Sequence, residues 1–263
     1  MSIRIRTPSL FRPPAWDDCT VIKESRLLVE DFNRRGVLRG GLTLGALTLL
    51  TGCDVSENES VQNGLRAVSS WNDGVQAAIF RPNHLAPTFS PSQVVKPPRF
   101  NAYYDIEEVK PIDGATWKLE LAGLIKDKRP WTAQQIYELP EQELIIRHIC
   151  VEGWDYIGQW SGPNLRAFLT GIGADLTARY VYFICNDDFT ESIDMTSALH
   201  PQTILATKYA GAVLTDPFGY PLRLRTAVKL GYKNAKWIRV IEVTNTFRPT
   251  FWSKQGENWF AGI

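Results

Sequence analysis

Short segments in which apolar and polar residues alternate constrain the fold of this chain most. This two-residue period predicts strands at residues 117–121, 143–151 and 236–243, and a short apolar run predicts another strand at residues 180–185. Three short elements lie between them: a helix from its cap Thr132 to Leu139, a helix over Asn164–Thr170 ended by Gly171 and Gly173, and a short helix or turn at 199–206. Because strands and helices do not alternate regularly, we expect an α+β fold with mixed β-sheets and short helices.

The N-terminal part of the chain carries an export pattern. Arg34 and Arg35 stand before an uncharged apolar stretch from Gly40 to Leu50, which is too short to span a bilayer as a mature helix. The pair, followed by an apolar residue and then Arg39, resembles a twin-arginine signal. The alternative is an ordinary secretory signal with a chance basic pair in front of it.

Residues 50–53 read Leu-Thr-Gly-Cys and resemble a bacterial lipobox. Acylation of Cys53 would hold the mature chain at a membrane, because each buried methylene contributes roughly 0.8 kcal/mol. Asp54 follows and favours the periplasmic side of the inner membrane. The alternative is a plain cleavage site beside a stray cysteine. We therefore divide the chain into a leader and twin-arginine lipoprotein signal (1–52), an extended linker (53–98) and one main domain (99–263).

Charge and cysteine content narrow the function. The formal net charge of +1 gives no bulk electrostatic reason to expect a nucleic-acid partner. Beyond Cys53 only Cys150 and Cys185 remain, and in an oxidising compartment their default is a disulfide. No spacing of cysteines or histidines supports zinc. Since the twin-arginine route carries folded proteins, it indicates a cofactor that is inserted before export.

Three motifs together resemble one family. Residues 146–154 read Ile-Arg-His-Ile-Cys-Val-Glu-Gly-Trp and are followed by Gln-Trp-Ser-Gly at 159–162. Residues 218–223 read Phe-Gly-Tyr-Pro-Leu-Arg and run into a basic segment that ends in Lys236-Trp237-Ile238, and residues 101–105 read Asn-Ala-Tyr-Tyr-Asp. The set is similar to the sulfite oxidase family of molybdopterin-dependent oxidoreductases, in particular to its bacterial branch that includes the periplasmic methionine-sulfoxide reductase catalytic subunit.

The resemblance implies a sulfite-oxidase-type molybdopterin-binding fold over the main domain, and a molybdenum ion ligated by the Cys150 thiolate, a soft ligand suited to such a metal. Arg223 and Lys236 match the cations at the phosphate end of the pterin. The whole implied cofactor set is Asn101, Tyr104, Asp105, Cys150, Cys185, Phe218, Arg223, Asn234, Ala235 and Lys236. Lys229 and Lys233, in contrast, read as solvated surface charges.

Other positions near Cys150 are candidates for catalysis, and two depart from the family pattern. Arg147, His148 and Trp154 flank the cysteine, but strand alternation sends the first two to opposite faces, so at most one of them lines a substrate pocket. Cys185, or Asn186 if the alignment shifts by one residue, stands where the methionine-sulfoxide reductase branch has a threonine, and Phe218 stands where a polar residue is usual. Phe218 therefore needs a backbone contact or a shifted loop.

Two classes of function follow. The resemblance implies an exported molybdenum enzyme that transfers an oxygen atom on a small S- or N-oxide or a sulfite-like substrate, and these substrates are not ranked. The chain has no haem-binding cysteine motif, so we expect a monomer that exchanges electrons with a separate membrane haem protein or cytochrome. The alternative is a non-enzymatic periplasmic lipoprotein binding module with a Cys150–Cys185 disulfide.

Overall fold

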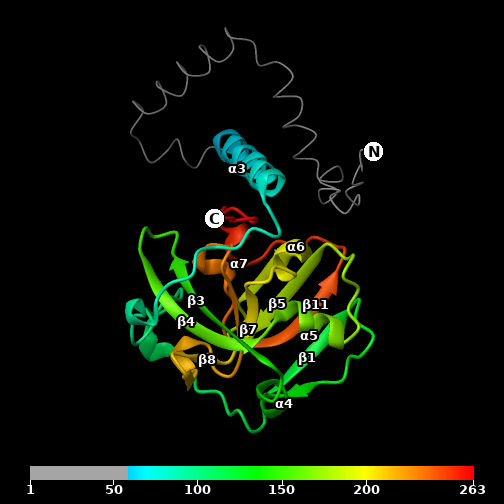
Figure 1. Cartoon of the computed structure of the whole chain (residues 1–263). Helices are drawn as coiled ribbons and strands as arrows, with labels where there is room; N and C mark the ends of the chain where they lie inside the picture. Colours follow the sequence, from blue (N-terminus) through cyan, green and yellow to red (C-terminus); the bar gives the residue numbers. More distant parts are fainter. Residues whose placement is uncertain (1–58) are drawn as a thin grey trace, which may run out of the picture. The chain divides into compact units, whose positions relative to one another are not determined.

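The computed structural model describes residues 59–263 (Figure 1). The predicted twin-arginine signal and the lipobox cysteine Cys53 lie outside the described residues. The chain divides into two compact units. In its described part, the first unit comprises residues 59–79 and 256–258, and the second comprises residues 80–255 and 259–263.

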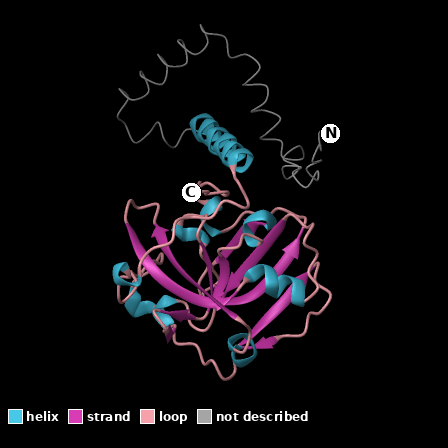
Figure 2. Cartoon of the chain, in the orientation of Figure 1, coloured by secondary structure: helices cyan, strands magenta, loops and turns pink. Residues whose placement is uncertain are grey.

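The first unit is built on one long helix, α3 (Glu59–Ile79) (Figure 2). The predicted extended linker over 53–98 is therefore wrong for these residues. Apolar side chains recur at Leu65, Val68, Val75 and Ile79, which is a helical period, and the prolines of the segment begin only at residue 82. None of the described helices combines the length and the apolarity that a membrane crossing requires. Residues 80–98 have little regular structure, as predicted, and belong to the second unit.

A five-stranded sheet forms one layer of the second unit, in the order β2-β1-β11-β5-β6. Its strands are β1 (Lys118–Gly123), β2 (Trp131–Thr132), β5 (Tyr180–Cys185), β6 (Thr190–Asp194) and β11 (Ile238–Thr244). Only the β1–β11 pair in this sheet is parallel, while the others are antiparallel. The layer thus joins strands from both ends of the domain.

Two smaller sheets complete the domain. The four-stranded sheet has the order β3-β4-β8-β9, with β3 (Glu141–Ile149), β4 (Asp155–Pro163), β8 (Lys208–Tyr209) and β9 (Ala212–Val213), and the two-stranded sheet pairs β7 (Thr203–Ala206) with β10 (Arg223–Thr226). The short helices are α4 (Ala133–Tyr137), α5 (Leu165–Gly171), α6 (Met195–Ala198) and α7 (Phe251–Lys254), with single 3-10 turns at Pro91–Gln93, Ile106–Glu108, Asp216–Phe218 and Gly231–Lys233. The α+β class with mixed sheets is confirmed.

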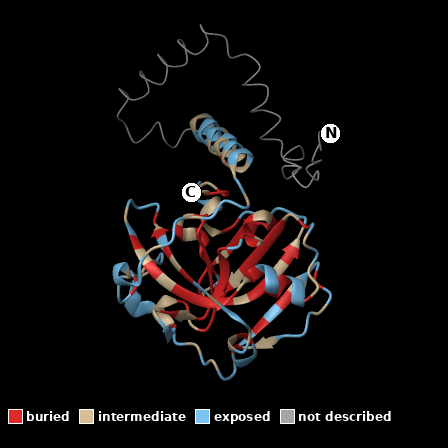
Figure 3. Cartoon of the chain, viewed as in Figure 1, coloured by how far each residue is buried: buried red, intermediate tan, exposed pale blue. Residues whose placement is uncertain are grey.

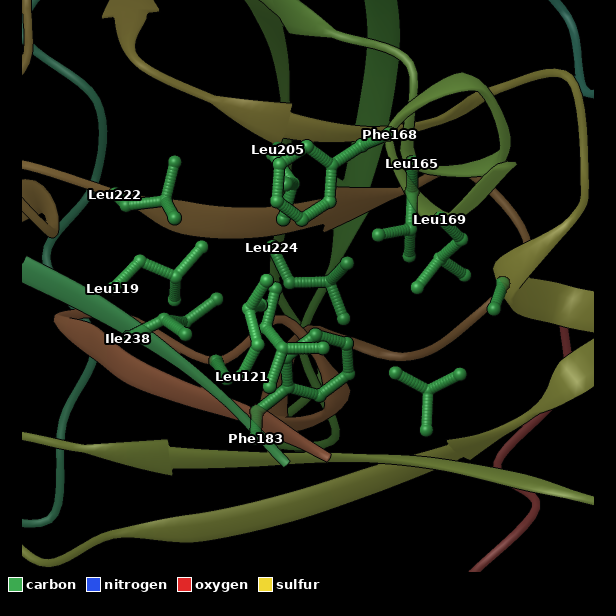
Figure 4. Close-up of a cluster of buried hydrophobic side chains, with 14 of the residues drawn as sticks. Leu119, Leu121, Leu165, Phe168, Leu169, Phe183, Leu205, Leu222, Leu224 and Ile238 are labelled. Carbon is green, nitrogen blue, oxygen red and sulfur yellow. The ribbon is translucent and has the colours of Figure 1, made fainter. Parts of the chain in front are cut away.

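Two apolar clusters lie on either side of the β7–β10 pair. The larger joins the five-stranded sheet to α5 and takes Leu205 and Leu224 from the pair (Figure 4). The smaller is built around Trp160 of β4 and takes Ile204 from the pair. Because strand residues alternate between faces, the positions beside Leu224 in β10 are directed away from the larger cluster. Those positions are the arginines 223 and 225, and both are buried. In this domain the buried residues are concentrated in the strands (Figure 3).

The strands predicted at residues 117–121, 143–151, 180–185 and 236–243 are confirmed as β1, β3, β5 and β11, and both predicted helices form. Thr132 caps α4 in a capping box with Gln135, and Asn164 caps α5 through the amide of Ala167. The helix or turn predicted at 199–206 is wrong in its second half, where Thr203–Ala206 is strand β7.

Candidate functional site

Cys150 lies in the tight turn between β3 and β4. Its amide donates to the carbonyl of Trp154 (2.9 Å), and its carbonyl accepts from the amide of Gly153 (3.2 Å), which has the positive φ of 87° that glycine tolerates. The side chain is only 7% exposed, and its Sγ lies 3.7 Å from Oε2 of Glu152, which also accepts a bond from Trp154 Nε1. Burial raises the pKa of the thiol. A single thiol is thus held nearly buried at a hairpin tip.

His148 lies two residues before Cys150 on the buried face of β3. Its ring is fully buried beside Tyr156 (centroids 5.0 Å apart) and stacks on Trp154 (5.8 Å). Within the described residues neither ring nitrogen has a hydrogen-bond partner. A Cβ at Gly231 would come within 2.7 Å of Nε2, so only glycine fits there. Burial first, and then the charges of nearby arginines and Lys236, hold the pKa of His148 well below its usual range.

Arg147 takes the opposite face of the same strand. Its side chain is 53% exposed and pairs with Asp155 at 3.5 Å. The expectation that Arg147 and His148 lie on opposite faces is therefore confirmed, and the buried face carries the histidine. Of the three candidates flanking the cysteine, the structure brings together His148 and Trp154.

Three buried cations, Arg223, Arg225 and Lys236, form what we call the basic cluster. Each is at most 8% exposed. The two guanidinium groups lie over the ring of Trp160, at 4.5 and 5.7 Å from its centroid. Arg225 donates to the carbonyl of Arg147 (2.7 Å) and Lys236 donates to the carbonyl of Asn101 (2.7 Å). The cluster therefore ties β10 and the start of β11 to β3 and to the segment at residue 101.

The charge of the basic cluster is only weakly compensated, because Asp187 interacts electrostatically with Lys236 but forms no ion pair with it. In the part of the chain that the structure describes, none of its members forms an ion pair, and Nε of Arg223 and Nε of Arg225 have no partner. Burial lowers the pKa of each arginine to about 10, and it lowers the pKa of Lys236 well below its ordinary value. Unpaired buried charge is costly, so the cluster is suited to receive an anion.

The other residues of the implied cofactor set surround this cluster. Asn234 is buried and its Oδ1 accepts from Arg225 (2.9 Å) and from the amide of Thr226 (2.8 Å). The carbonyl of Phe218 accepts from Arg223 at 2.9 Å, so Phe218 contributes backbone and no polar side chain. The carbonyl of Ala235 accepts from the amide of Leu224, which fixes the edge of β10.

The residues of the segment 101–105 differ in how closely they contact the rest of the site. Tyr104 donates to Oδ2 of Asp187 (3.0 Å) and stacks on Trp237 (6.0 Å). These three residues line a cavity of about 690 Å³, and the ring centroid of Trp237 lies 4.1 Å from Nζ of Lys236. Asp105 is exposed at the N-cap position of the turn Ile106–Glu108 and makes no capping bond there.

Cys185 ends β5 and is fully buried, with its amide bonded to the carbonyl of Phe189. Cys150 and Cys185 are both free thiols. The disulfide on which the non-enzymatic alternative depended is therefore absent between these two described residues, and that alternative is wrong on this point. Burial raises the pKa of the Cys185 thiol well above its usual value.

The prediction that Lys229 and Lys233 are solvated is wrong. Both are about 1% exposed. Lys229 pairs with Asp194 at 3.0 Å, and Lys233 pairs with Glu191. The two carboxylates belong to β6, whose residues are buried although its sequence is polar. The basic segment turns inward because these carboxylates compensate it.

Sequence reasoning missed Arg225, Trp160 and Gly231. The signal for Arg225 was present, because it lies two residues after Arg223 and so shares its face in a strand. In the sequence Trp160 stands out only as part of a motif. Its contacts with the two guanidinium groups depend on how β4 lies against β10 in the fold. Gly231 is required by the close approach of His148, which no local pattern reveals.

Comparison with known proteins identifies the family. Residues 106–252 match the family described as the oxidoreductase molybdopterin binding domain. The chain belongs to this family. It is 48% identical over 229 residues to the putative protein-methionine-sulfoxide reductase subunit YedZ1 of Azospira oryzae, covering 87% of each chain. The predicted membership of a molybdopterin-dependent oxidoreductase family is confirmed, and the chain is a molybdopterin-binding oxidoreductase.

More distant relatives agree in part of their length. The protein-methionine-sulfoxide reductase catalytic subunit MsrP of Ralstonia nicotianae is 28% identical over 161 residues, which cover 55% of this chain and 49% of that one. The chain thus matches about half the length of that relative. Among solved structures, the sulfane dehydrogenase SoxCD of Paracoccus pantotrophus aligns with a TM-score of 0.49 and 17% identity over 52% of this chain and 40% of that chain.

The described residues fit a molybdopterin. The cofactor is polar along its length and ends in a phosphate, so it needs donors and cations. Among the described residues the basic cluster offers charge that forms no ion pair, together with free Nε donors, and His148 offers ring nitrogens without partners. The soft thiol of Cys150 lies two residues after His148 in the chain. These are the groups that such a cofactor requires, and they occur within one buried region.

Proposed function

We propose that this oxidoreductase is an exported molybdenum enzyme that reduces methionine sulfoxide by oxygen-atom transfer. The observation that carries the proposal is the basic cluster, a set of three buried cations that form no ion pair in the described part of a chain that also holds a nearly buried thiol at Cys150. In a chain that binds molybdopterin, these buried cations are well suited to bind the phosphate group of the cofactor.

Each part of the site has a role in the proposal. Arg223 and Lys236 would hold the phosphate end, and Arg225, which is bonded to Asn234, would supply a third positive charge. Cys150 supplies the thiolate ligand of the metal, which would keep the thiol deprotonated although burial raises its pKa in the protein alone. When bound, the cofactor supplies the two-electron redox chemistry, and the protein positions and tunes it.

His148 and Trp154 form the wall beside the metal ligand. Their stacked rings exclude water from the side of the turn, and burial keeps the imidazole neutral, so it can donate one hydrogen bond and accept another. Trp154 is held in place by its bond to Glu152 and by the guanidinium of Arg99, 4.4 Å from its ring centroid. These residues would orient a substrate at the metal.

The substrate class rests on the relatives, two of which are named as methionine-sulfoxide reductases or their subunits. The reaction consumes a sulfoxide, two electrons and two protons and yields a thioether and water. The electrons would come from a separate partner, a membrane haem protein or a cytochrome. Reduction of other S- or N-oxides and sulfite oxidation are the competing reactions.

Export and anchoring belong to the same proposal. The arginine pair at 34–35 supports transport of the folded, cofactor-loaded protein by the twin-arginine machinery. The lipobox supports an anchor at Cys53, with the enzyme on the periplasmic side of the inner membrane.

The test uses protein exported by its native route and purified from the envelope. A reduced artificial electron donor is supplied together with methionine sulfoxide, dimethyl sulfoxide or trimethylamine N-oxide, and sulfite oxidation is measured in parallel with an artificial acceptor. We expect methionine sulfoxide to give the highest kcat/KM. A protein that carries molybdenum but oxidises sulfite with a higher kcat/KM would contradict the proposed substrate, and one without molybdenum would contradict the proposed enzyme.

A further inference from the structure

Helix α3 exposes a largely apolar face. Five large apolar side chains, each between 37% and 71% exposed, lie along it: Leu65, Val68, Trp71, Val75 and Ile79. Their spacing of three, four or seven residues places them along one side of the helix. Single exposed apolar residues are ordinary on a protein surface, but five along one helix mark a contact surface. We call these five residues the apolar face of α3.

The charged residues of α3 lie on the other side, while the uncharged Asn72 falls among the apolar residues. Its three charged residues, Glu59, Arg66 and Asp73, are seven residues apart and so follow one line along the helix. That side is partly covered within the same compact unit, because Nδ2 of Asn258 donates to the carbonyl of Ser69 (3.1 Å) and to Oδ1 of Asp73 (3.2 Å). The helix therefore has a charged side that is partly covered and a largely apolar side that is exposed.

We propose that the apolar face of α3 lies on the surface of the lipid bilayer. The inference rests on the anchoring part of the proposed function. Glu59 is six residues after Cys53, and six residues span at most about 20 Å. A lipid on Cys53 would therefore keep the start of α3 close to the membrane surface. The apolar side chains of α3 would then be close enough to the bilayer to be buried among its acyl chains.

The composition of the face fits a bilayer. It contains no charged residue, and it includes Trp71, an amphipathic ring of the kind enriched at membrane interfaces. Because α3 does not have the apolarity of a membrane span, it would lie in the plane of the interface. With one basic and two acidic residues, the helix would not depend on anionic lipids, so binding should be insensitive to salt.

The experiment places an environment-sensitive thiol label on either side of the helix. Val68→Cys puts it on the apolar face, and Asn63→Cys puts it on an exposed polar position as the matched control. The full-length exported protein is reconstituted into protein-free phosphatidylcholine vesicles that carry acyl-chain quenchers. Wild-type protein taken through the same labelling gives the background. Ile79→Cys and Gln62→Cys repeat the comparison.

We expect quenching at residue 68 to exceed that at residue 63 by at least about threefold, and to be unchanged by salt. Equal quenching at both positions, or none, would overturn the proposal. So would a label at residue 68 that is shielded only after the electron-transfer partner is added, because the face would then dock on protein. Flotation of the vesicles tests the anchor separately, and molybdenum content and sulfoxide turnover report on the proposed enzyme.

Discussion

At the scale of single residues, the decisive feature is charge that the protein alone does not satisfy. The two lysines 229 and 233 show the contrast, because each is as buried as the basic cluster and each has a carboxylate partner. A chain that can supply such partners for two cations and leaves three others without them has kept a place for an external anion. The cluster is thus explained by binding and the lysine pairs by folding.

Arg223→Ala should lower the molybdenum and pterin content of the purified protein together. Loss of charge-assisted bonds to a phosphate costs about 1.5–3 kcal/mol, which is roughly ten- to a hundredfold in affinity. Arg223→Lys should restore only part, because an ammonium lacks the planar fork. Lys128→Ala, at an exposed lysine, serves as the control. Full cofactor content in both Arg223→Ala and Lys236→Ala would mean that the cofactor is held elsewhere.

Lys229→Ala should destabilise the fold and is not a neutral surface change. It leaves Asp194 buried without its cation, and breaking a buried pair costs about 3–5 kcal/mol. Chemical denaturation measures the loss against Lys254→Ala, at an exposed lysine. Equal unfolding free energies for the two variants would contradict the burial of Lys229.

At the scale of elements, the β3–β4 hairpin and the β7–β10 pair make the site. The hairpin turn presents the thiol, its buried face presents His148, and Trp160 supports the arginines of β10. Strands with regular alternation, such as β1 and β11, were predictable from sequence, and so were the caps of α4 and α5. Polar but buried strands were not: Thr190–Asp194 carries two carboxylates whose partners lie some forty residues later.

Site residues that belong to a family motif could be predicted from the sequence. Site residues whose position depends on tertiary packing could not. Cys150, Arg223 and Lys236 follow from the family resemblance. Arg225 needed the strand assignment of β10, which a four-residue run with two arginines conceals. The inward turn of Lys229 was misread because its counter-charge lies on a strand distant in sequence.

The junction of β6 and α6 should make stability depend on pH. Burial alone would raise the pKa of Asp194, but the charge of Lys229 and bonds from Ser197 outweigh it and hold the pKa below its ordinary value. A carboxylate whose pKa is depressed in the folded state stabilises the protein above the pKa of the unfolded chain, about 3.9, and this contribution is lost as the pH falls.

Asp194→Asn should therefore be less stable than the wild type at neutral pH, and its unfolding free energy should fall less between about pH 5 and pH 3. Glu107→Gln, at an exposed carboxylate, should retain the wild-type profile. Urea unfolding at a series of pH values measures both. Parallel profiles for Asp194→Asn and the wild type would show that this carboxylate does not carry the acid sensitivity.

At the scale of the whole molecule, the proposed function combines a cofactor-binding domain with an export signal. In the proposed route the pterin is inserted before transport, and this would require a pathway for folded proteins. Arg34→Lys together with Arg35→Lys should therefore leave folded, molybdenum-loaded protein in the cytoplasm, as fractionation with metal analysis would show. Normal export of the double variant would favour the general secretory route.

The central claim is that Cys150 ligates molybdenum, and X-ray absorption at the molybdenum edge tests it most directly. Exported wild-type protein and Cys150→Ser, each purified with its cofactor, are compared. Replacing the soft thiolate by a hard hydroxyl should remove one sulfur neighbour of the metal and abolish turnover, even where pterin content is retained. An unchanged number of sulfur neighbours in a loaded Cys150→Ser variant would contradict the account.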